Sequence, residues 1–482
     1  MTNHDGTIFF LPGLGFGSAS AAPLAAALGD RFRVVGIDLP GHGRTPDAVD
    51  GSVSTLADAA VTAIEAKADG GPWLLAAHSM GGKVAALVAA RVLSGHANVF
   101  GLAGVVLLAP SPPTPEPMDD DTRALMLSWA ENGPLAEVDA RKFIAQNVAS
   151  SLDAAVEQDA VGQVRQMSPL AWQRWLNEGS RENISATVGV IDLPVVVMAG
   201  EDDDDLGASA QPRLLGAVYP RARFVSLPAT GHLLPYEQPH KVAVEIVRLW
   251  ESTAAASPEV DPEWGRVIAS HRTGVEERSL LARRAVADDL NYRPRALSPG
   301  QLATLRALAD RLVPQSEARR IDLAARVDAD LASGRGDGWR PFGLPDDASA
   351  YRLGLDAIAA VWADGVAQQD ALIRRIIAGE LITGAPWGGE VFGRWFEDLR
   401  TDLTRTWMAH PASLSRIGYD GFATSGPGAE PAGYVSLGAG VRDPWEPADL
   451  GTLLSDTADE SDGSGDRGAT NNTGQARREN AA

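Results

Sequence analysis

A serine, a histidine and a run of aspartates fall where a hydrolytic site could assemble. Ser79 stands in the context Ala-His-Ser-Met-Gly between an apolar run and an Ala/Val-rich stretch, and His232 and Asp203 each follow a later apolar run. A serine hydroxyl is weakly nucleophilic at neutral pH and needs a general base that a carboxylate orients. We therefore predict acyl transfer through a triad of Ser79, His232 and Asp203.

The surroundings of Ser79 predict a nucleophile elbow, the tight strand-to-helix turn that exposes a serine hydroxyl. Small residues, Ala77 and Gly81, flank it, as a tight turn requires. The backbone N–H of Met80 is then one predicted donor of an oxyanion hole. We expect the second from Leu14, in the Leu-Pro-Gly-Leu-Gly segment after the first apolar run.

The sequence identifies the aspartate of the triad less clearly than it identifies the histidine. Spacing from Gly200 favours Asp203, but Asp202, Asp204 and Asp205 lie beside it, and the sequence leaves open which carboxylate points inward. Such an acidic run could bind a cation, although a solvated loop with one recruited member is commoner. We predict no metal and no bound cofactor.

The predicted triad residues belong to an alternation of strands and helices from residue 7 to about 250. Six apolar runs read as strands of a parallel sheet with helices on both faces: 7–11, 33–37, 73–76, 105–109, 195–199 and 223–227. Between about 111 and 192 the alternation lapses into a Pro-rich turn and helical segments, which predicts an inserted cap. Its Trp129, Trp172 and Trp175 are candidate substrate-binding residues, and helical spacing fits a role in the cap core equally well.

Taken together, these segments resemble the α/β-hydrolase superfamily over about residues 7–250. The matching motifs are Leu-Pro-Gly-Leu-Gly, Ile-Asp-Leu-Pro-Gly-His-Gly from 37, the Ser79 elbow, 200–203 and Gly231-His232. The resemblance implies a hydrolytic triad under a helical cap. Pro12 replaces the usual His of the oxyanion loop, and Ala77 replaces the first Gly of the elbow. The superfamily is chemically broad, and a serine nucleophile argues against its dehalogenases, which use Asp there.

The second half reads as mainly helical. We expect a hydrolase domain over 1–253, a linker and leading helix over 254–289, a helical domain over 290–447 and a disordered acidic tail over 448–482. Apolar residues at helical spacing support the third segment. Six sequence stretches resemble the gluconate 2-dehydrogenase subunit 3 family; they begin at Arg295, Tyr351, Gln368, His410, Arg416 and Asp443. That resemblance implies docking to a flavin-dependent GMC-type dehydrogenase, with Trp387, Trp395 and Trp407 as candidate anchors.

Composition excludes several other classes. The chain has 482 residues, a net charge of −21 and no cysteine, which disfavours nucleic-acid and anionic-membrane partners and excludes thiol chemistry. No export signal or membrane-spanning run is visible, so we expect a cytoplasmic protein. The Gly-rich segment around Gly13 resembles a dinucleotide-binding motif but lacks the third glycine of that motif. The segment around Lys83 resembles a phosphate-binding loop, but the first and last residues of that motif do not match.

These observations predict a serine hydrolase acting on a carboxylic ester or lactone, fused to a helical domain that docks a flavoprotein. The alternative is a binding protein: an accessory subunit of a flavin-dependent sugar or alcohol dehydrogenase, with a vestigial or secondary triad.

Overall fold

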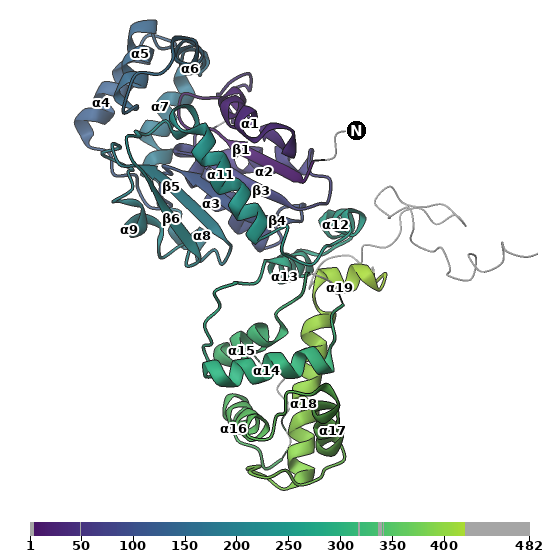
Figure 1. The fold of residues 1–482 in the computed structure, drawn as a ribbon. Helices are drawn as coiled ribbons and strands as arrows, with labels where there is room; N and C mark the ends of the chain where they lie inside the picture. Colours follow the sequence, from purple (N-terminus) through teal and green to yellow (C-terminus); the bar gives the residue numbers. More distant parts are fainter. Residues whose placement is uncertain (1–3, 49, 317–318, 336–339, 341, 420–482) are drawn as a thin grey trace, which may run out of the picture.

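A six-stranded parallel sheet forms the centre of the first half, and a largely helical half follows it (Figure 1). The structure, a computed structural model, describes residues 4–419 apart from 49, 317–318, 336–339 and 341. The strand order is β2-β1-β3-β4-β5-β6, with every neighbouring pair parallel. The strands are β1 (Gly6–Leu11), β2 (Phe32–Gly36), β3 (Trp73–His78), β4 (Leu102–Leu108), β5 (Val195–Gly200) and β6 (Ala222–Leu227). The predicted fold class is confirmed.

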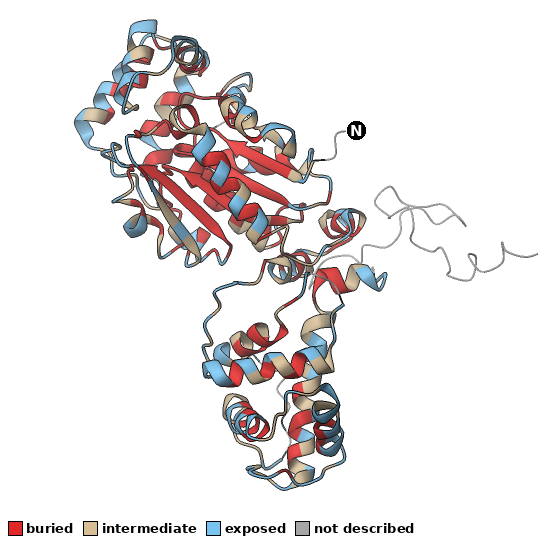
Figure 2. Ribbon diagram, in the orientation of Figure 1, coloured by how far each residue is buried: buried red, intermediate tan, exposed pale blue. Residues whose placement is uncertain are grey.

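Helices cover both faces of the sheet, which explains why its strands are almost continuously apolar. Successive side chains of a strand point to opposite faces, so Ile8 and Phe10 of β1 join one core, whereas Phe9 and Leu11 join the other. Figure 2 shows the central strands as buried. The flanking helices are α1 (Ala22–Leu28) and α11 (Pro239–Ser252) on one face, and α2 (Val53–Glu65) and α3 (Met80–Leu93) on the other.

A helical insertion joins β4 to β5, and its first four helices lie at the carboxyl ends of the strands, whereas the last leads back to the amino end of β5 (Figure 1). Its helices are α4 (Asp120–Ser128), α5 (Glu137–Gln146), α6 (Ala154–Gln166), α7 (Pro169–Asn177) and α8 (Ser185–Val188). Side-chain caps begin two of them, since Asp119 accepts from the Thr122 N–H and Ser168 from the Ala171 N–H. Short helices α9 (Gln211–Leu215) and α10 (Leu234–Glu237) follow β5 and β6.

Two helices, α12 (Pro262–Ala269) and α13 (Val275–Ala285), form in the stretch expected to be a linker with one leading helix. The buried Arg278 of α13 holds this stretch to the first half. Its guanidinium donates to the carbonyls of Ile268, Ser270 and Thr273 and also to that of Gly95, just after α3. Four such bonds satisfy most donors of a buried guanidinium, so the connection is packed and hydrogen-bonded.

The helical half has a core of its own. Its helices are α14 (Pro299–Leu312), α15 (Leu323–Ser333), α16 (Asp347–Ala359), α17 (Val366–Ile377), α18 (Gly389–Met408) and α19 (Pro411–Arg416). A capping box between Ser298 and Gln301 begins α14. Trp395 is only 1% exposed inside this core, so it is unavailable as the docking anchor that the sequence suggested. The motif at Asp443 and the expected tail lie outside the described residues.

Within the described part of the chain, no helix has both the length and the apolar character needed to cross a membrane.

Candidate active site

Ser79, His232 and Asp203 form one hydrogen-bonded chain at the carboxyl ends of β3, β6 and β5. The Nε2 atom of His232 lies 2.8 Å from Ser79 Oγ, and its Nδ1 lies 2.7 Å from Asp203 Oδ2. Ser79 is 7% exposed, and the side chains of His232 and Asp203 are 14% and 5% exposed. A nucleophile, a base and an orienting carboxylate are thus in contact in a largely water-excluded position.

Ser79 occupies a strained turn between the fully buried β3 and α3. Its φ of 50° is in the left-handed region that residues with a Cβ avoid. Close packing holds this conformation: a Cβ at Gly81 would lie 2.6 Å from the carbonyl oxygens of Leu11 and Pro12, and one at Gly82 would lie 2.3 Å from Pro110 Cβ. The two glycines let the loop after β1 and the end of β4 approach the elbow.

Asp203 is the member of the acidic run whose carboxylate points inward. Its Oδ2 contacts His232, and its Oδ1 accepts the backbone N–H groups of Asp205 and Leu206 at 3.2 and 3.0 Å. The neighbouring loop packs closely, because a Cβ at Gly200 would lie 2.0 Å from the Thr230 carbonyl oxygen. These bonds fix the carboxylate that orients the imidazole.

Electrostatics favour the charge distribution of an Asp–His pair. Burial by itself raises the pKa of Asp203, but His232 and the hydrogen bonds to the carboxylate outweigh it and lower that pKa. Burial likewise lowers the pKa of His232, and Asp203, Glu116 and Asp205 more than reverse the shift. The net raised pKa of His232 means that the surrounding carboxylates stabilise the imidazolium that forms when the base takes a proton.

The two predicted oxyanion donors lie beside the serine. Met80 is the first residue of α3, where helix geometry supplies no carbonyl partner for the N–H. The loop that carries Leu14 approaches the elbow so closely that a Cβ at Gly13 would lie 3.1 Å from Ser79 Cβ. Leu14 itself is 6% exposed. The loop that carries Leu14 and the first residue of α3 thus both lie next to Ser79.

The three cap tryptophans are buried in one core that is continuous with the first half. Trp172 lies against the loop after β1, since a Cβ at Gly15 would be 3.5 Å from its ring, and Trp129 packs on Trp172. Trp175 and Met80 line the same small cavity of about 10 Å³. Trp175 therefore lies near the elbow and Trp172 near the loop after β1, while all three rings also pack in the cap core.

Two other buried histidines are held by backbone carbonyls. Nε2 of His78 donates to the His232 carbonyl oxygen at 2.8 Å, while Nδ1 of His42 lies 2.9 Å from the Pro40 carbonyl oxygen. Burial lowers the pKa of His78 to about 3, with help from His232, and that of His42 to about 4. Both are therefore neutral at pH 7, and the His78 bond supports the loop that carries the base.

The structure adds Glu116 and Lys83, which sequence reasoning had not placed near the site. Glu116 accepts a 3.0 Å hydrogen bond from Ser111 Oγ, and the Ser111 N–H donates to the Ser79 carbonyl at 2.9 Å. Burial raises the pKa of Glu116, against the opposing effect of Ser111, His232, Lys83 and Arg123. In the sequence Glu116 is a glutamate inside a Pro-rich run. Such a run predicts a turn, but it does not show which other part of the chain the turn contacts.

Lys83 is fully buried beneath the cap. Its Nζ donates to the carbonyls of Gly179, Ser180 and Glu182 at 3.0, 3.2 and 2.7 Å, and lies 5.9 Å from the centre of the Trp175 ring. Burial lowers its pKa to about 8. The elbow helix is thereby tied to the end of the cap, and the Gly-Gly-Lys segment that hinted at a phosphate loop has a packing role.

Comparisons with known proteins concern the first half of the chain. Residues 8–246 match the model of the alpha/beta hydrolase family. The curated pimeloyl-[acyl-carrier protein] methyl ester esterase of Methylococcus capsulatus is 36% identical over 121 residues, which are 24% of this chain and 43% of that protein. The match therefore spans less than half of that relative's length.

Solved structures with a similar fold include a thermophilic esterase from Thermogutta terrifontis and the enol-lactonase from Burkholderia xenovorans LB400. The first has 21% identity and a TM-score of 0.43, over 52% of this chain and 90% of that one. The second has 18% identity and a TM-score of 0.42, over 51% and 92%.

Proposed function

We propose that the protein is a serine hydrolase that cleaves a carboxylic ester or lactone. The match of residues 8–246 to the alpha/beta hydrolase family supports this proposal. The observation that carries this proposal is the hydrogen-bonded chain from Ser79 through His232 to Asp203, with bonds of 2.8 and 2.7 Å. A strained serine at a helix N-terminus beside a base with an oriented imidazole matches the requirements of nucleophilic acyl transfer.

The reaction begins when His232 Nε2 takes the proton of Ser79 and the serine Oγ attacks the carbonyl carbon. The oxyanion then accepts hydrogen bonds from the N–H groups of Leu14 and Met80. His232 gives its proton to the departing alkoxide, which leaves an acyl group on Ser79. Water, deprotonated by His232, attacks this acyl-enzyme and releases the acid, while Asp203 keeps the imidazole in the required tautomer.

The cap supplies an apolar surface near the reacting atoms. Trp172 contacts the loop that bears Leu14, and Trp175 lies near Met80. We assign to these two rings and Trp129 the wall of an apolar substrate site, which favours uncharged esters and lactones. The curated relative is by name a methyl ester esterase, so methyl esters of carboxylic acids belong among the first substrates to test.

The test is hydrolysis of short p-nitrophenyl esters, methyl esters and sugar lactones by the purified full chain. Ser79→Ala is expected to abolish turnover without loss of structure. Ser252→Ala, at the end of α11 far along the helix from the site, serves as the matched control and should retain the parent kcat/KM. Equal turnover by Ser79→Ala and the parent protein would overturn the assignment.

The helical half suggests a second candidate function, docking of a flavin-dependent GMC-type dehydrogenase. It has a separate core, and Trp387 and Trp407 are partly exposed beside it, as anchors of an interface would be. A lactone made by sugar oxidation would then reach a tethered hydrolase at raised local concentration. Binding of a purified GMC-type dehydrogenase should survive Ser79→Ala and weaken with Trp387→Ala. If binding occurs but no ester or lactone is hydrolysed, the accessory-subunit alternative is favoured.

A further inference from the structure

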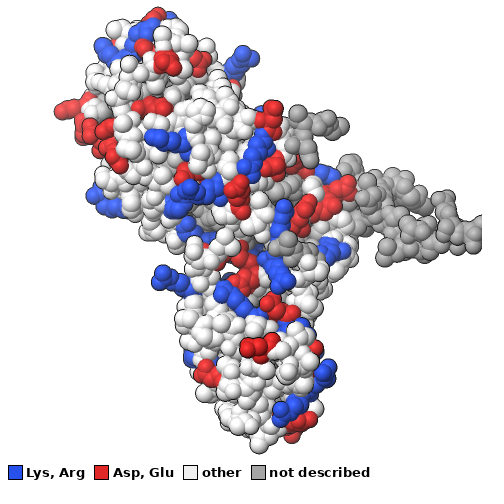
Figure 3. All heavy atoms as spheres, viewed as in Figure 1, with Lys and Arg blue, Asp and Glu red and all other residues white. Residues whose placement is uncertain are grey.

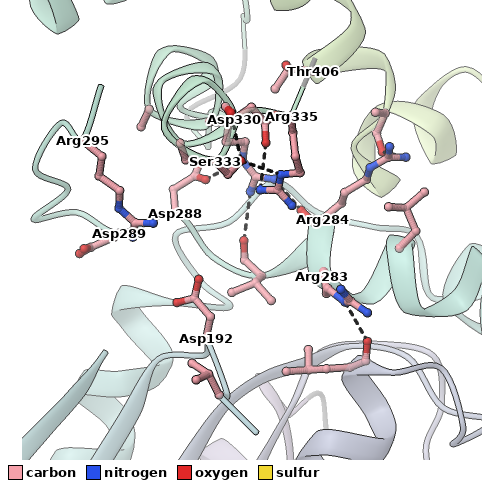
Figure 4. A pocket seen from close by; sticks show the side chains of 18 of the residues that line it. Asp192, Arg283, Arg284, Asp288, Asp289, Arg295, Asp330, Ser333, Arg335 and Thr406 are labelled. Atoms are coloured by element: carbon pink, nitrogen blue, oxygen red, sulfur yellow. Dashed lines mark hydrogen bonds and ion pairs between the residues drawn. The ribbon is translucent and has the colours of Figure 1, made fainter. Parts of the chain in front are cut away.

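A cavity of about 1530 Å³ lies between the two halves of the molecule, away from the triad. One wall comes from the C-terminal part of α3 and from residues 182–192, and the other from α13, α15, α16 and α18. Figure 4 shows this cavity from close by. Sites for small molecules usually measure roughly 300–1,000 Å³, so the cavity has room for a ligand of nucleotide size together with water.

The charge of the cavity differs from that of the whole chain. Nine arginines and eight carboxylates line it, although the chain as a whole carries −21. Basic and acidic side chains gather around the junction of the halves in Figure 3. Every cationic side chain of the lining other than a histidine is an arginine, the residue whose planar guanidinium binds carboxylate and phosphate in two-bond geometry.

Not all of these arginines are neutralised by the protein itself. Four of them pair with aspartates of the lining, at distances of 2.7, 2.9, 2.8 and 3.4 Å: Arg326 with Asp288, Arg335 with Asp330, Arg340 with Asp347, and Arg405 with Asp402. Four others make no ion pair with a carboxylate anywhere in the described residues: Arg221, Arg283, Arg284 and Arg295. The nine arginines outnumber the eight carboxylates of the lining by one, so the cavity is close to neutral, whereas the chain as a whole carries −21.

Arg284 is the least satisfied of the four. It is half-buried, yet within the described chain its side chain makes one hydrogen bond, to the Ala409 carbonyl at the limiting distance of 3.5 Å. A guanidinium has five N–H donors. Burial lowers the pKa of Arg284, and nearby Arg326 adds to that effect against Asp330. A partly buried cation without a counter-ion is costly, and an anion in the cavity would offset that cost.

Arg283 and Arg295 also line the cavity and keep some of their N–H donors free. Arg283 donates to the Leu93 carbonyl and to Ser279 Oγ, and Arg295 lies 5.8 Å from the centre of the Tyr292 ring. Figure 4 shows Arg283, Arg284 and Arg295 around the cavity, from α13 and the segment that follows it. Several guanidiniums around one space suit a ligand with several anionic groups.

We propose that this cavity binds a small polyanion, a molecule with two or more carboxylate or phosphate groups, with Arg284 as the central contact and Arg283 and Arg295 beside it. Acidic macromolecules are disfavoured because the net charge of the chain repels them. A ligand that contacts both walls also stabilises the packing of the two halves, since it binds only the folded arrangement.

The test is calorimetric titration of the full chain with pyrophosphate and with citrate, and with glucose as an uncharged probe. Saturable binding of one anion per chain is expected, without binding of glucose. Arg284→Gln should weaken that binding at least tenfold. The matched control is Arg374→Gln, the same change at an exposed position of α17 outside the cavity, which should leave the affinity unchanged.

Two results would overturn the proposal: absence of saturable binding by both anions, or equal weakening by the two substitutions, which would indicate a general charge effect. Arg295→Gln decides the matter if Arg284→Gln does not fold, because Arg295 is exposed and its replacement should still weaken binding. Binding of pyrophosphate alone identifies phosphate as the recognised group, and binding of citrate alone identifies carboxylate.

Discussion

Replacement of Gly81 by alanine tests how the elbow is held against the loop after β1. The added Cβ would lie 2.6 Å from the carbonyl oxygens of Leu11 and Pro12, which is 0.8 Å short of an ordinary contact of 3.4 Å. Both obstacles are backbone atoms, so either α3 or the loop that bears Leu14 must move. Overpacking of this kind costs about 1–3 kcal/mol of unfolding free energy. Misplacement of catalytic groups by about 1 Å costs roughly a hundredfold in rate.

We therefore expect Gly81→Ala to lower kcat about a hundredfold, with a smaller effect on KM, and to lower the unfolding free energy by about 2 kcal/mol. The assays are ester hydrolysis under conditions where circular dichroism shows the folded state, and urea unfolding. Gly162→Ala is the matched control: Gly162 is in cap helix α6 with no atom within 4 Å of the new Cβ. It should gain about 0.5–1 kcal/mol. If Gly81→Ala keeps the activity of the parent protein, α3 does not pack against the loop after β1 as closely as the structure shows.

Three further predictions concern the buried charges. Glu116→Gln removes a charge that raises the pKa of His232; because the base must be neutral, the acid limb of kcat/KM should move to lower pH, and an unmoved limb would contradict this electrostatic role. Lys83→Met leaves three cap carbonyls without their donor and should cost about 2–3 kcal/mol in urea unfolding, whereas an unchanged midpoint would show that the bonds contribute nothing. Burial holds the pKa of His78 at about 3, below its ordinary 6.5, so the unfolded state binds the proton first and stability falls as pH drops below about 6.5. Between pH 6.5 and 5 this amounts to about 2 kcal/mol, and His78→Gln should show a correspondingly flatter dependence of the unfolding free energy on pH.

The order of strands and helices could be predicted from the sequence because each strand is a short, continuous apolar run. Alternate residues of such a run enter the two cores of the sheet, as Phe9 and Phe10 do. The helix over Pro299–Leu312 can also be predicted from the sequence, because its capping residues and its apolar stripe are local features. The two helices in the expected linker are harder to predict from the sequence, because their packing depends on a buried hydrogen bond from Arg278 to a distant part of the chain.

The positions of Ser79 and His232 relative to their elements follow from motifs, but the contacts around them depend on tertiary structure. Glu116 lies in a Pro-rich run that indicates only a turn, and its approach to the site depends on how β4 packs against α3. Helical periodicity cannot separate a pocket wall from a cap core, so the burial of Trp129, Trp172 and Trp175 could be learned only from the structure.

Covalent labelling by a fluorophosphonate tests the central claim, that Ser79 is an activated nucleophile, without knowledge of the natural substrate. Such a probe reacts with a serine only when a base and an oxyanion hole assist it. Peptide mass spectrometry should find one adduct, on Ser79, in the parent protein, none in Ser79→Ala, and a far slower reaction in His232→Ala. A folded parent protein that stays unlabelled, or is labelled equally after loss of His232, would contradict the account.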